Sequence, residues 1–153
     1  MELMPLSPDF KDFLELLNRL EVRYMVIGGW AVGLHGWPRA TKDLDLWVAI
    51  DSANAEKIIQ ALNEFPGPGP IASDFFSDEV KNIYFMGVPP NRIDLISAID
   101  GLEFEDCWPR AEVATYDGVE FPLISFGDLK EYKKASGRFR DLADLEDLER
   151  LPD

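Results

Sequence analysis

The chain has 153 residues, with 29 acidic and 15 basic side chains and a net charge of −14 at pH 7. The length suits one domain over residues 1–153, and a hydrophobic share of 46% excludes a disordered composition. So acidic a surface disfavours general binding to nucleic acid, because affinity for phosphate backbones comes largely from Lys and Arg. No apolar run approaches the ~20 residues of a membrane span, and the first residues do not resemble a leader. We therefore expect a soluble, cytoplasmic protein that does not contact a membrane.

The first half of the chain predicts helices and strands in alternation. Ser7 and Pro8 are typical of a helix start, and the apolar residues that follow recur at helical spacing. The expected elements are a helix from Ser7 to about residue 20, a strand at 24–27, a short helix at 30–34, a strand at 43–50 and a helix at 53–65 capped by Asp51 and Ser52.

The second half predicts two hairpins and two closing helices. Strands at 80–86 and 92–97 are separated by a short turn, which indicates an antiparallel hairpin. Asp117-Gly118 is a strong type I′ turn signal between strands at 113–116 and 119–124. Helices follow at 129–135 and 138–151, and the second should carry an apolar stripe of Leu142, Leu145 and Leu148. Together these elements predict an α+β (α/β mixed) fold, a mixed sheet with flanking helices.

Acidic side chains stand in two of the predicted strands. Asp43 and Asp45 are separated by one residue, so they should point to the same face of their strand. Two carboxylates side by side in an apolar strand repel each other and lose hydration, and a divalent cation between them explains them best. Asp94 has a similar setting in the 92–97 strand. Three carboxylates on neighbouring strands would suit magnesium ions that carry the phosphates of a nucleotide.

Gly28 and Gly29 lie between the first strand and the short helix. Glycine allows a close approach of the backbone to a ligand, and the start of a helix offers free N–H groups to a phosphate. A glycine pair is weak evidence alone. Followed by Arg39, Thr41 and the two strand acids, it favours a nucleotide site.

These residues together resemble the nucleotidyltransferase superfamily related to DNA polymerase beta. Its signature is a strand, Gly-Gly or Gly-Ser, about a dozen residues, Asp-hydrophobic-Asp, and a third Asp on a later strand. Residues 28–31 (Gly-Gly-Trp-Ala) and 39–45 (Arg-Ala-Thr-Lys-Asp-Leu-Asp) resemble the small bacterial branch that includes AbiEii-type toxins and minimal nucleotidyltransferases. The resemblance extends from about residue 24 to the C-terminal run at 129–148. Gly29 departs from the pattern, because many transferases have a phosphate-binding serine there.

The resemblance implies a polymerase-beta-like fold and a magnesium-dependent enzyme, with manganese as a possible substitute. Such a nucleotidyltransferase, a transferase of phosphorus-containing groups, moves a nucleoside monophosphate from an NTP to an acceptor hydroxyl and releases pyrophosphate. Asp94 would act as a metal ligand, as the general base, or as both. The implied catalytic and metal-binding residues are Asp43, Asp45 and Asp94. The implied nucleotide-binding residues are Gly28, Gly29, Arg39, Thr41, Lys133 and Asp141.

Structural interpretations compete at several of these positions. Asp94 could simply pair with Arg92, which shares its strand face, and Arg138 with Asp141 could be an ordinary helix ion pair. Arg39 could be a surface loop residue and Lys133 a solvated helix lysine. We interpret His35 and the single cysteine, Cys107, as structural, and Trp30 and Trp37 as core or lid aromatics.

Two other functions remain open from the sequence. The chain could be a non-catalytic binding module, such as a toxin–antitoxin or defence component, or a nucleotide sensor that acts through a partner protein. Gly29 supports these alternatives, whereas three clustered acids argue against them. The acceptor is also open between a tRNA end, a protein side chain and a small hydroxylated molecule, and a partner chain could complete the site.

Overall fold

A mixed β-sheet forms the centre of the protein, which we describe from a computed structural model covering residues 5–37, 43–65, 70–77, 81–88 and 91–152. The sheet of these residues has the order β3-β4-β2-β1-β6-β5. The β1–β6 and β2–β4 pairs are parallel, and the other neighbours are antiparallel. The strands are β1 (Tyr24–Ile27), β2 (Leu44–Val48), β3 (Ile83–Met86), β4 (Ile93–Ile96), β5 (Glu112–Tyr116) and β6 (Val119–Leu123).

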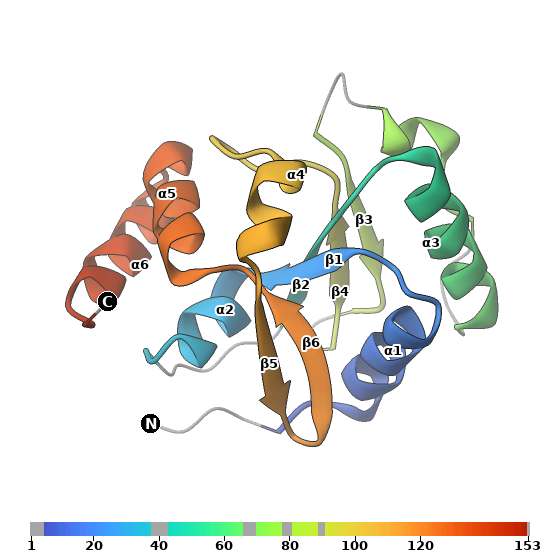
Figure 1. The fold of residues 1–153 in the computed structure, drawn as a ribbon, viewed down its shortest axis with the longest axis horizontal. Coiled ribbons are helices and arrows are strands. Elements are labelled where there is room, and N and C mark those ends of the chain that lie inside the picture. The colour runs from blue at the N-terminus through green and yellow to red at the C-terminus, as the bar shows by residue number, and fades with distance from the viewer. Residues whose placement is uncertain (1–4, 38–42, 66–69, 78–80, 89–90, 153) are drawn as a thin grey trace.

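Among the described residues, four longer helices flank the sheet as two pairs, and the shorter α2 and α4 lie between the pairs (Figure 1). Figure 1 shows α1 and α3 on the right of the sheet, and α5 and α6 together on the left. The helices are α1 (Pro8–Arg19), α2 (Gly28–Leu34), α3 (Ser52–Glu64), α4 (Phe104–Cys107), α5 (Phe126–Ser136) and α6 (Phe139–Glu149), with 3-10 turns η1 (Ser73–Phe76) and η2 (Trp108–Arg110). This arrangement confirms the mixed α+β class. None of the helices in the described ranges is long and apolar enough to cross a membrane.

Local sequence signals explain where most of these elements begin and end. The hydroxyl of Ser7 accepts a hydrogen bond from the Phe10 N–H and caps α1, as predicted. In the β5–β6 hairpin, Asp117 and Gly118 both have positive φ, 51° and 81°, which is the type I′ turn that this pair favours. Gly137 ends α5 in the left-handed conformation. The predicted turn at 89–91 lies largely outside the described residues.

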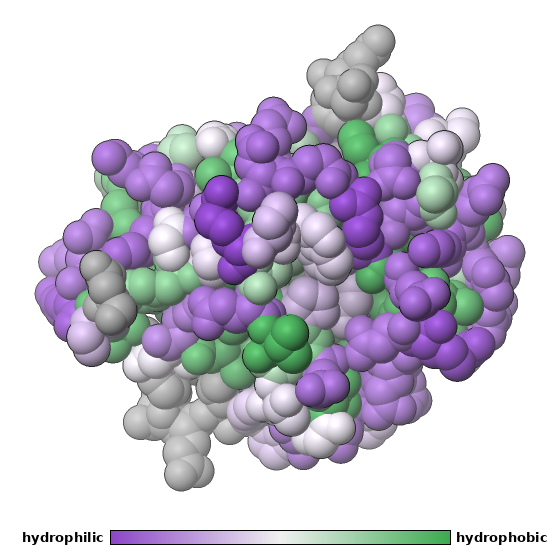
Figure 2. Space-filling model, viewed as in Figure 1, coloured by the Kyte–Doolittle hydropathy of each residue, from purple (hydrophilic) through white to green (hydrophobic). Residues whose placement is uncertain are grey.

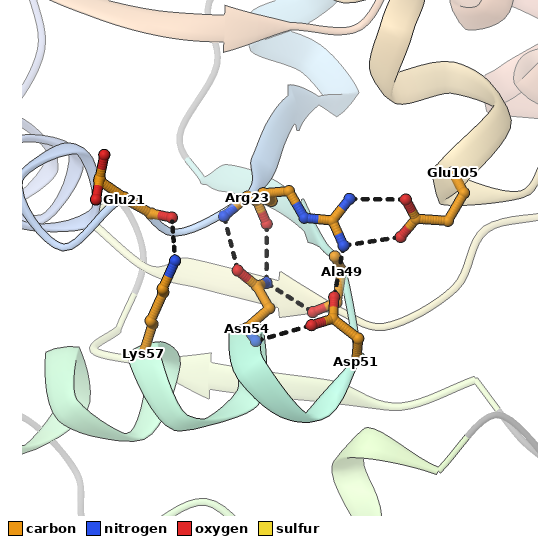
Figure 3. Close-up of polar contacts among 7 residues, drawn as sticks. All are labelled: Glu21, Arg23, Ala49, Asp51, Asn54, Lys57 and Glu105. Atoms are coloured by element: carbon orange, nitrogen blue, oxygen red, sulfur yellow. Dashed lines mark hydrogen bonds and ion pairs between the residues drawn. The ribbon is translucent and has the colours of Figure 1, made fainter.

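The buried side chain of Asn54 ties α3 to β1 and β2 (Figure 3). Its amide oxygen accepts from the Arg23 N–H at 2.8 Å, and its amide nitrogen donates to the carbonyls of Arg23 and Ala49 at 3.1 and 2.7 Å. The Arg23 guanidinium in turn binds Asp51, the N-cap of α3, and Glu105 of α4. This network fixes the end of β2, the strand that carries Asp45.

The buried side of α6 differs from the predicted leucine stripe. Leu148 is buried, but Leu142 is 42% exposed, whereas Asp141 and Asp144 are buried. The spacing of the leucines predicted that they form the buried face of this helix. The prediction is wrong because helical periodicity cannot show that a buried cation from another helix packs against the acidic side. Here Lys133 of α5 is that cation, and it turns the acidic side of α6 inward.

The outer surface is strongly polar. In the view of Figure 2 hydrophilic residues dominate, and hydrophobic ones appear in small groups. This agrees with the net charge of −14. Cys107 is fully buried, as the sequence suggested, and burial raises the pKa of its thiol to about 11.

Candidate active site

The parallel pairing of β2 and β4 brings the predicted carboxylates together. Asp45 is the direct neighbour of Asp94 in the register of these strands, so both side chains lie on the same face of the sheet. Asp43 immediately precedes β2 and shares that face by alternation. The structure therefore places Asp45 beside Asp94 and puts Asp43 on the same face. That these three acids form a metal-binding and catalytic site stays a prediction.

The cluster makes ionisation of Asp45 costly. Burial and the negative charges of Asp94 and Asp43 raise the pKa of Asp45 to about 7, although the positive charge of Lys133 opposes the shift. Like charges in a partly buried site cannot all ionise without a compensating cation. The electrostatics of the site therefore favour the binding of positive charge beside Asp45.

Arg92 supplies one such positive charge. Its Nε and Nη2 donate to the two carboxylate oxygens of Asp94 at 2.7 and 3.1 Å, and Nη2 lies 3.2 Å from Oδ2 of Asp43. The pairing of Asp94 with Arg92 that the sequence left open is thus present. The other oxygen of Asp43, Oδ1, is buried and has no hydrogen-bond partner within the described residues.

Gly28 lies directly beneath the carboxylate of Asp45. It follows the last residue of β1 and has a φ of +73°. A Cβ atom at this position would collide with Oδ2 of Asp45. Both the backbone conformation and the space exclude a larger side chain. The glycine that the sequence singled out therefore allows the turn from β1 into α2 to contact the acid of β2. Gly29 follows it in α2.

Lys133 and Asp141, which lie 8 residues apart in sequence, meet in a buried ion cluster between α5 and α6. The Lys133 ammonium lies 3.0 Å from Oδ1 of Asp141 and 2.9 Å from Oδ2 of Asp144. Asp141 also accepts from Ser136 and from Arg138 at 2.8 Å. Asp144 was missed by the sequence analysis, although its i, i+3 spacing from Asp141 on one helix face was a usable signal.

Of the other residues that the sequence singled out, some lie in or against the hydrophobic core and some lie outside the residues that the structure describes. Arg39 and Thr41 lie outside them, so their place in the site stays a prediction. Trp30 is buried in the core, and Trp37 packs partly buried against it. His35 is bonded through Nε2 to the carbonyl of Ile124 at 2.7 Å, as expected of a structural histidine.

Two of the three carboxylates, Asp43 and Asp94, contact Arg92, whereas Asp45 lies against Gly28. No group of three or more Asp, Glu, His or Cys side chains is positioned to hold a metal ion within the residues that the structure covers. The donor set nevertheless has the right chemistry, because carboxylate oxygens are the ligands that Mg²⁺ prefers. A divalent cation would compete with the Arg92 guanidinium for Asp43 and Asp94.

Comparison with solved structures identifies the architecture. The chain is similar to the lincosamide antibiotic adenylyltransferase LnuA bound to lincomycin, with 15% identity over 97% of this chain and 100% of that chain, and a TM-score of 0.62. This chain has a nucleotidyltransferase fold. A comparison with protein-family models finds no match, and a comparison with curated proteins finds none.

Two further structures share the nucleotidyltransferase fold. An antigenic nucleotidyltransferase-like protein from Paracoccidioides brasiliensis is 21% identical over 95% of this chain and 78% of its own, with a TM-score of 0.55. ANT(2")-Ia in complex with adenylyl-2"-tobramycin is 13% identical over 89% of this chain and 83% of its own, with a TM-score of 0.55. At these identities the likeness extends to the fold, and the carboxylate site must carry the functional argument.

Proposed function

We propose that the protein is a metal-dependent nucleotidyltransferase that moves a nucleoside monophosphate from an NTP to an acceptor hydroxyl. The observation that carries the proposal is the pairing of Asp45 with Asp94 across β2 and β4, directly over Gly28. A non-catalytic fold has no need of clustered acids that raise the pKa of one of them to about 7. A site that binds a cation together with phosphates needs such clustered acids.

Asp43, Asp45 and Asp94 would hold the metal ion in this proposal. Oδ1 of Asp43, which is buried with no partner among the described residues, and the raised pKa of Asp45 both support a fit to added positive charge. A bound Mg²⁺ would neutralise the charge of the triphosphate and favour the departure of pyrophosphate. Binding would also draw Asp43 and Asp94 away from Arg92.

The protein groups then have distinct tasks. Gly28 and Gly29 would allow the backbone to approach the phosphates, and Arg39 and Thr41, which lie outside the described residues, stay predicted phosphate-binding residues. Lys133, held by Asp141, contributes its positive charge to the site. Asp94 accepts the proton of the acceptor hydroxyl, whose oxygen attacks the α-phosphorus as the bond to the pyrophosphate oxygen breaks. Catalysis of this kind is mostly positioning and charge stabilisation.

A small hydroxylated molecule is the acceptor class that best suits the chain. The similar structures LnuA and ANT(2")-Ia are described with lincomycin and with adenylyl-2"-tobramycin, both small molecules. The net charge of −14 weighs against a nucleic-acid acceptor. A role in a toxin–antitoxin or defence system and a location in the cytoplasm stay predictions of the sequence.

One observation favours the alternative of a binding module without catalysis. Arg92 already neutralises Asp43 and Asp94, as in a purely structural ion cluster. In that case the protein would bind a nucleotide or a partner and transfer nothing.

Substitution of Asp43 by asparagine separates the two functions. The wild type and Asp43→Asn are incubated with each NTP, Mg²⁺ and a panel of hydroxylated small molecules, and mass spectrometry detects acceptors that gain one nucleoside monophosphate. We expect transfer by the wild type and at least a 100-fold loss in Asp43→Asn, on the order of what one site group supplies. Transfer that persists in the variant would contradict the mechanism, and its absence from the wild type would favour the binding module.

A further inference from the structure

The outer strand β3 presents two large apolar side chains beside the carboxylate site. In the antiparallel β3–β4 register, Phe85 stands opposite Asp94 and Ile83 stands opposite Ile96. Residues directly opposite in such a pair point to the same face of the sheet, with Cα atoms about 5 Å apart. Phe85 and Ile83 therefore lie on the face that carries Asp45 and Asp94.

Arg92 shows how close the ring of Phe85 is to Asp94. The guanidinium carbon of Arg92 lies 4.5 Å from the ring centroid, while its Nε donates to Asp94 at 2.7 Å. One guanidinium thus contacts both the aromatic ring and the carboxylate. Asp94 is buried and bonded to Arg92 through both oxygens, so a molecule that rests on the ring would reach Asp94 only when Arg92 is displaced from it.

The apolar surface here is open to solvent. Phe85 is 51% exposed and Ile83 43%, whereas Met86, on the opposite face of β3, is buried. Edge strands of soluble proteins usually carry charged or short side chains, because exposed apolar edges invite aggregation. Exposed apolar groups beside a polar site are instead typical of ligand-binding surfaces.

The order of strands places this surface on one particular side of the carboxylates. From the edge inward the sheet runs β3, β4, β2 and β1, so Phe85, Asp94, Asp45 and Gly28 follow one another across it. Gly28, where the donor phosphates would approach, is on the far side of Asp45 from Phe85. The surface over β4 and β3 is on the opposite side of Asp45, where an acceptor would not displace the donor phosphates.

We propose that Phe85 and Ile83 form the acceptor subsite, and that the acceptor is a small hydroxylated molecule with an apolar ring face. This rests on the proposed transferase function, because that function defines donor and acceptor. The apolar face of the molecule packs on the Phe85 ring, and its hydroxyl is directed toward Asp94. Arg92 lies between the two and can contact a polar group of the acceptor.

The probe for this subsite is 2-phenylethanol, which combines an apolar ring with one hydroxyl. Two-dimensional amide NMR of the labelled protein is recorded during its titration, with glycerol as the hydroxylated probe that lacks a ring. We expect 2-phenylethanol to shift the signals of Ile83, Phe85 and Asp94, and glycerol to leave them unchanged. Phe139, the most exposed large apolar side chain described at 94%, is the internal control for non-specific contact.

Variants test whether the ring itself binds the probe. Phe85→Ala should weaken binding roughly five-fold or more, as expected for loss of an aromatic contact. The matched control Phe139→Ala should leave the affinity within about two-fold of the wild type. Ile83→Thr, which keeps a β-branched side chain suited to a strand, should also weaken binding and serves as the second test in case Phe85→Ala disturbs the fold. Equal shifts at Phe139 and Phe85, or unchanged affinity in Phe85→Ala and Ile83→Thr, would overturn the proposal.

A nucleotide competition distinguishes failure of this inference from failure of the proposed function. The titration is repeated with Mg²⁺ and each α,β-methylene NTP analogue, and the shifts at Phe85 should persist when an analogue is bound. Displacement of 2-phenylethanol by the analogue would mean that Phe85 holds the donor base, which overturns the acceptor subsite but not the transferase. If no analogue binds, the transferase proposal fails, and with it the acceptor assignment, even where the probe still binds at Phe85.

Discussion

At Gly28 the chain leaves β1 with φ +73° and passes directly under the carboxylate of Asp45. A side chain at this position would face two obstacles, because the left-handed conformation disfavours any Cβ and the nearest atoms belong to Asp45. The same residue sets how closely a phosphate could approach the acid. The stability of the protein and the proposed nucleotide site therefore both require glycine at position 28.

Gly28→Ala should lower both stability and nucleotide binding. The left-handed conformation alone costs about 1–2 kcal/mol with a Cβ, and displacement of Asp45 adds to this. We expect a fall in the melting temperature of roughly 5 °C or more. The matched control is Gly127→Ala in α5, where an added Cβ would meet nothing within 4 Å apart from its chain neighbours and the backbone of its own helix. Thermal unfolding of both variants checks this, and equal melting temperatures would contradict the role given to Gly28.

Between α5 and α6, the buried Lys133 holds two acids of the last helix. Burial alone would raise the pKa of Asp141, but hydrogen bonds from Ser136 and Lys133 and the charge of Lys133 outweigh it and lower the pKa below its usual value. This cluster replaces the apolar contact that leucine spacing predicted for α6. The helix pair is thus held partly by charge, and its stability should respond to acid.

Asp141→Asn tests this pH dependence. Because the folded-state pKa of Asp141 is lowered, its stabilising contribution is present above the pKa of the unfolded chain and is lost as the pH falls through the folded value. At pH 7 the variant should be less stable by about 3–5 kcal/mol, the cost of breaking a buried ion pair. The difference from the wild type should shrink toward pH 2.

Urea unfolding at pH 7 and at pH 2 measures this difference. The matched control is Glu146→Gln on the same helix, which loses only an exposed pair with Arg150 and should match the wild type within about 1 kcal/mol. A gap between Asp141→Asn and wild type that stays constant from pH 7 to pH 2 would contradict the assigned role.

At the scale of the whole molecule, the sheet order β3-β4-β2-β1 brings together segments that are far apart in the sequence. Asp45 meets Asp94 through strand pairing, and Lys133 acts on Asp45 from α5. The same strand order places Gly28 and the exposed apolar side chains of β3 on either side of these acids. The proposed active site therefore depends on the packing of several elements rather than on any single motif.

The sequence predicted local features well, because caps, turns and periodicity are local. The Ser7 cap, the Asp117-Gly118 turn and the acids of β2 and β4 are examples. It could not predict that Asp141 and Asp144 face inward, because that depends on Lys133 from another helix.

The open apolar edge also escaped the sequence analysis. Ile83 and Phe85 have the composition of an ordinary buried strand, and only the sheet order shows that β3 is an edge. Exposure of a strand face is set by what packs on it, which local patterns do not contain.

The most direct test of the central claim is calorimetric titration of each of the four NTPs, with and without Mg²⁺, into the wild type and Asp43→Asn. We expect at least one NTP to bind only with Mg²⁺ and to bind at least about ten-fold more weakly to the variant, because the three carboxylates would hold the metal ion that accompanies the triphosphate. That result would also name the donor. Failure of every NTP to bind, or Mg²⁺-independent binding that is equal in both proteins, would contradict a metal-dependent nucleotide site at Asp43, Asp45 and Asp94.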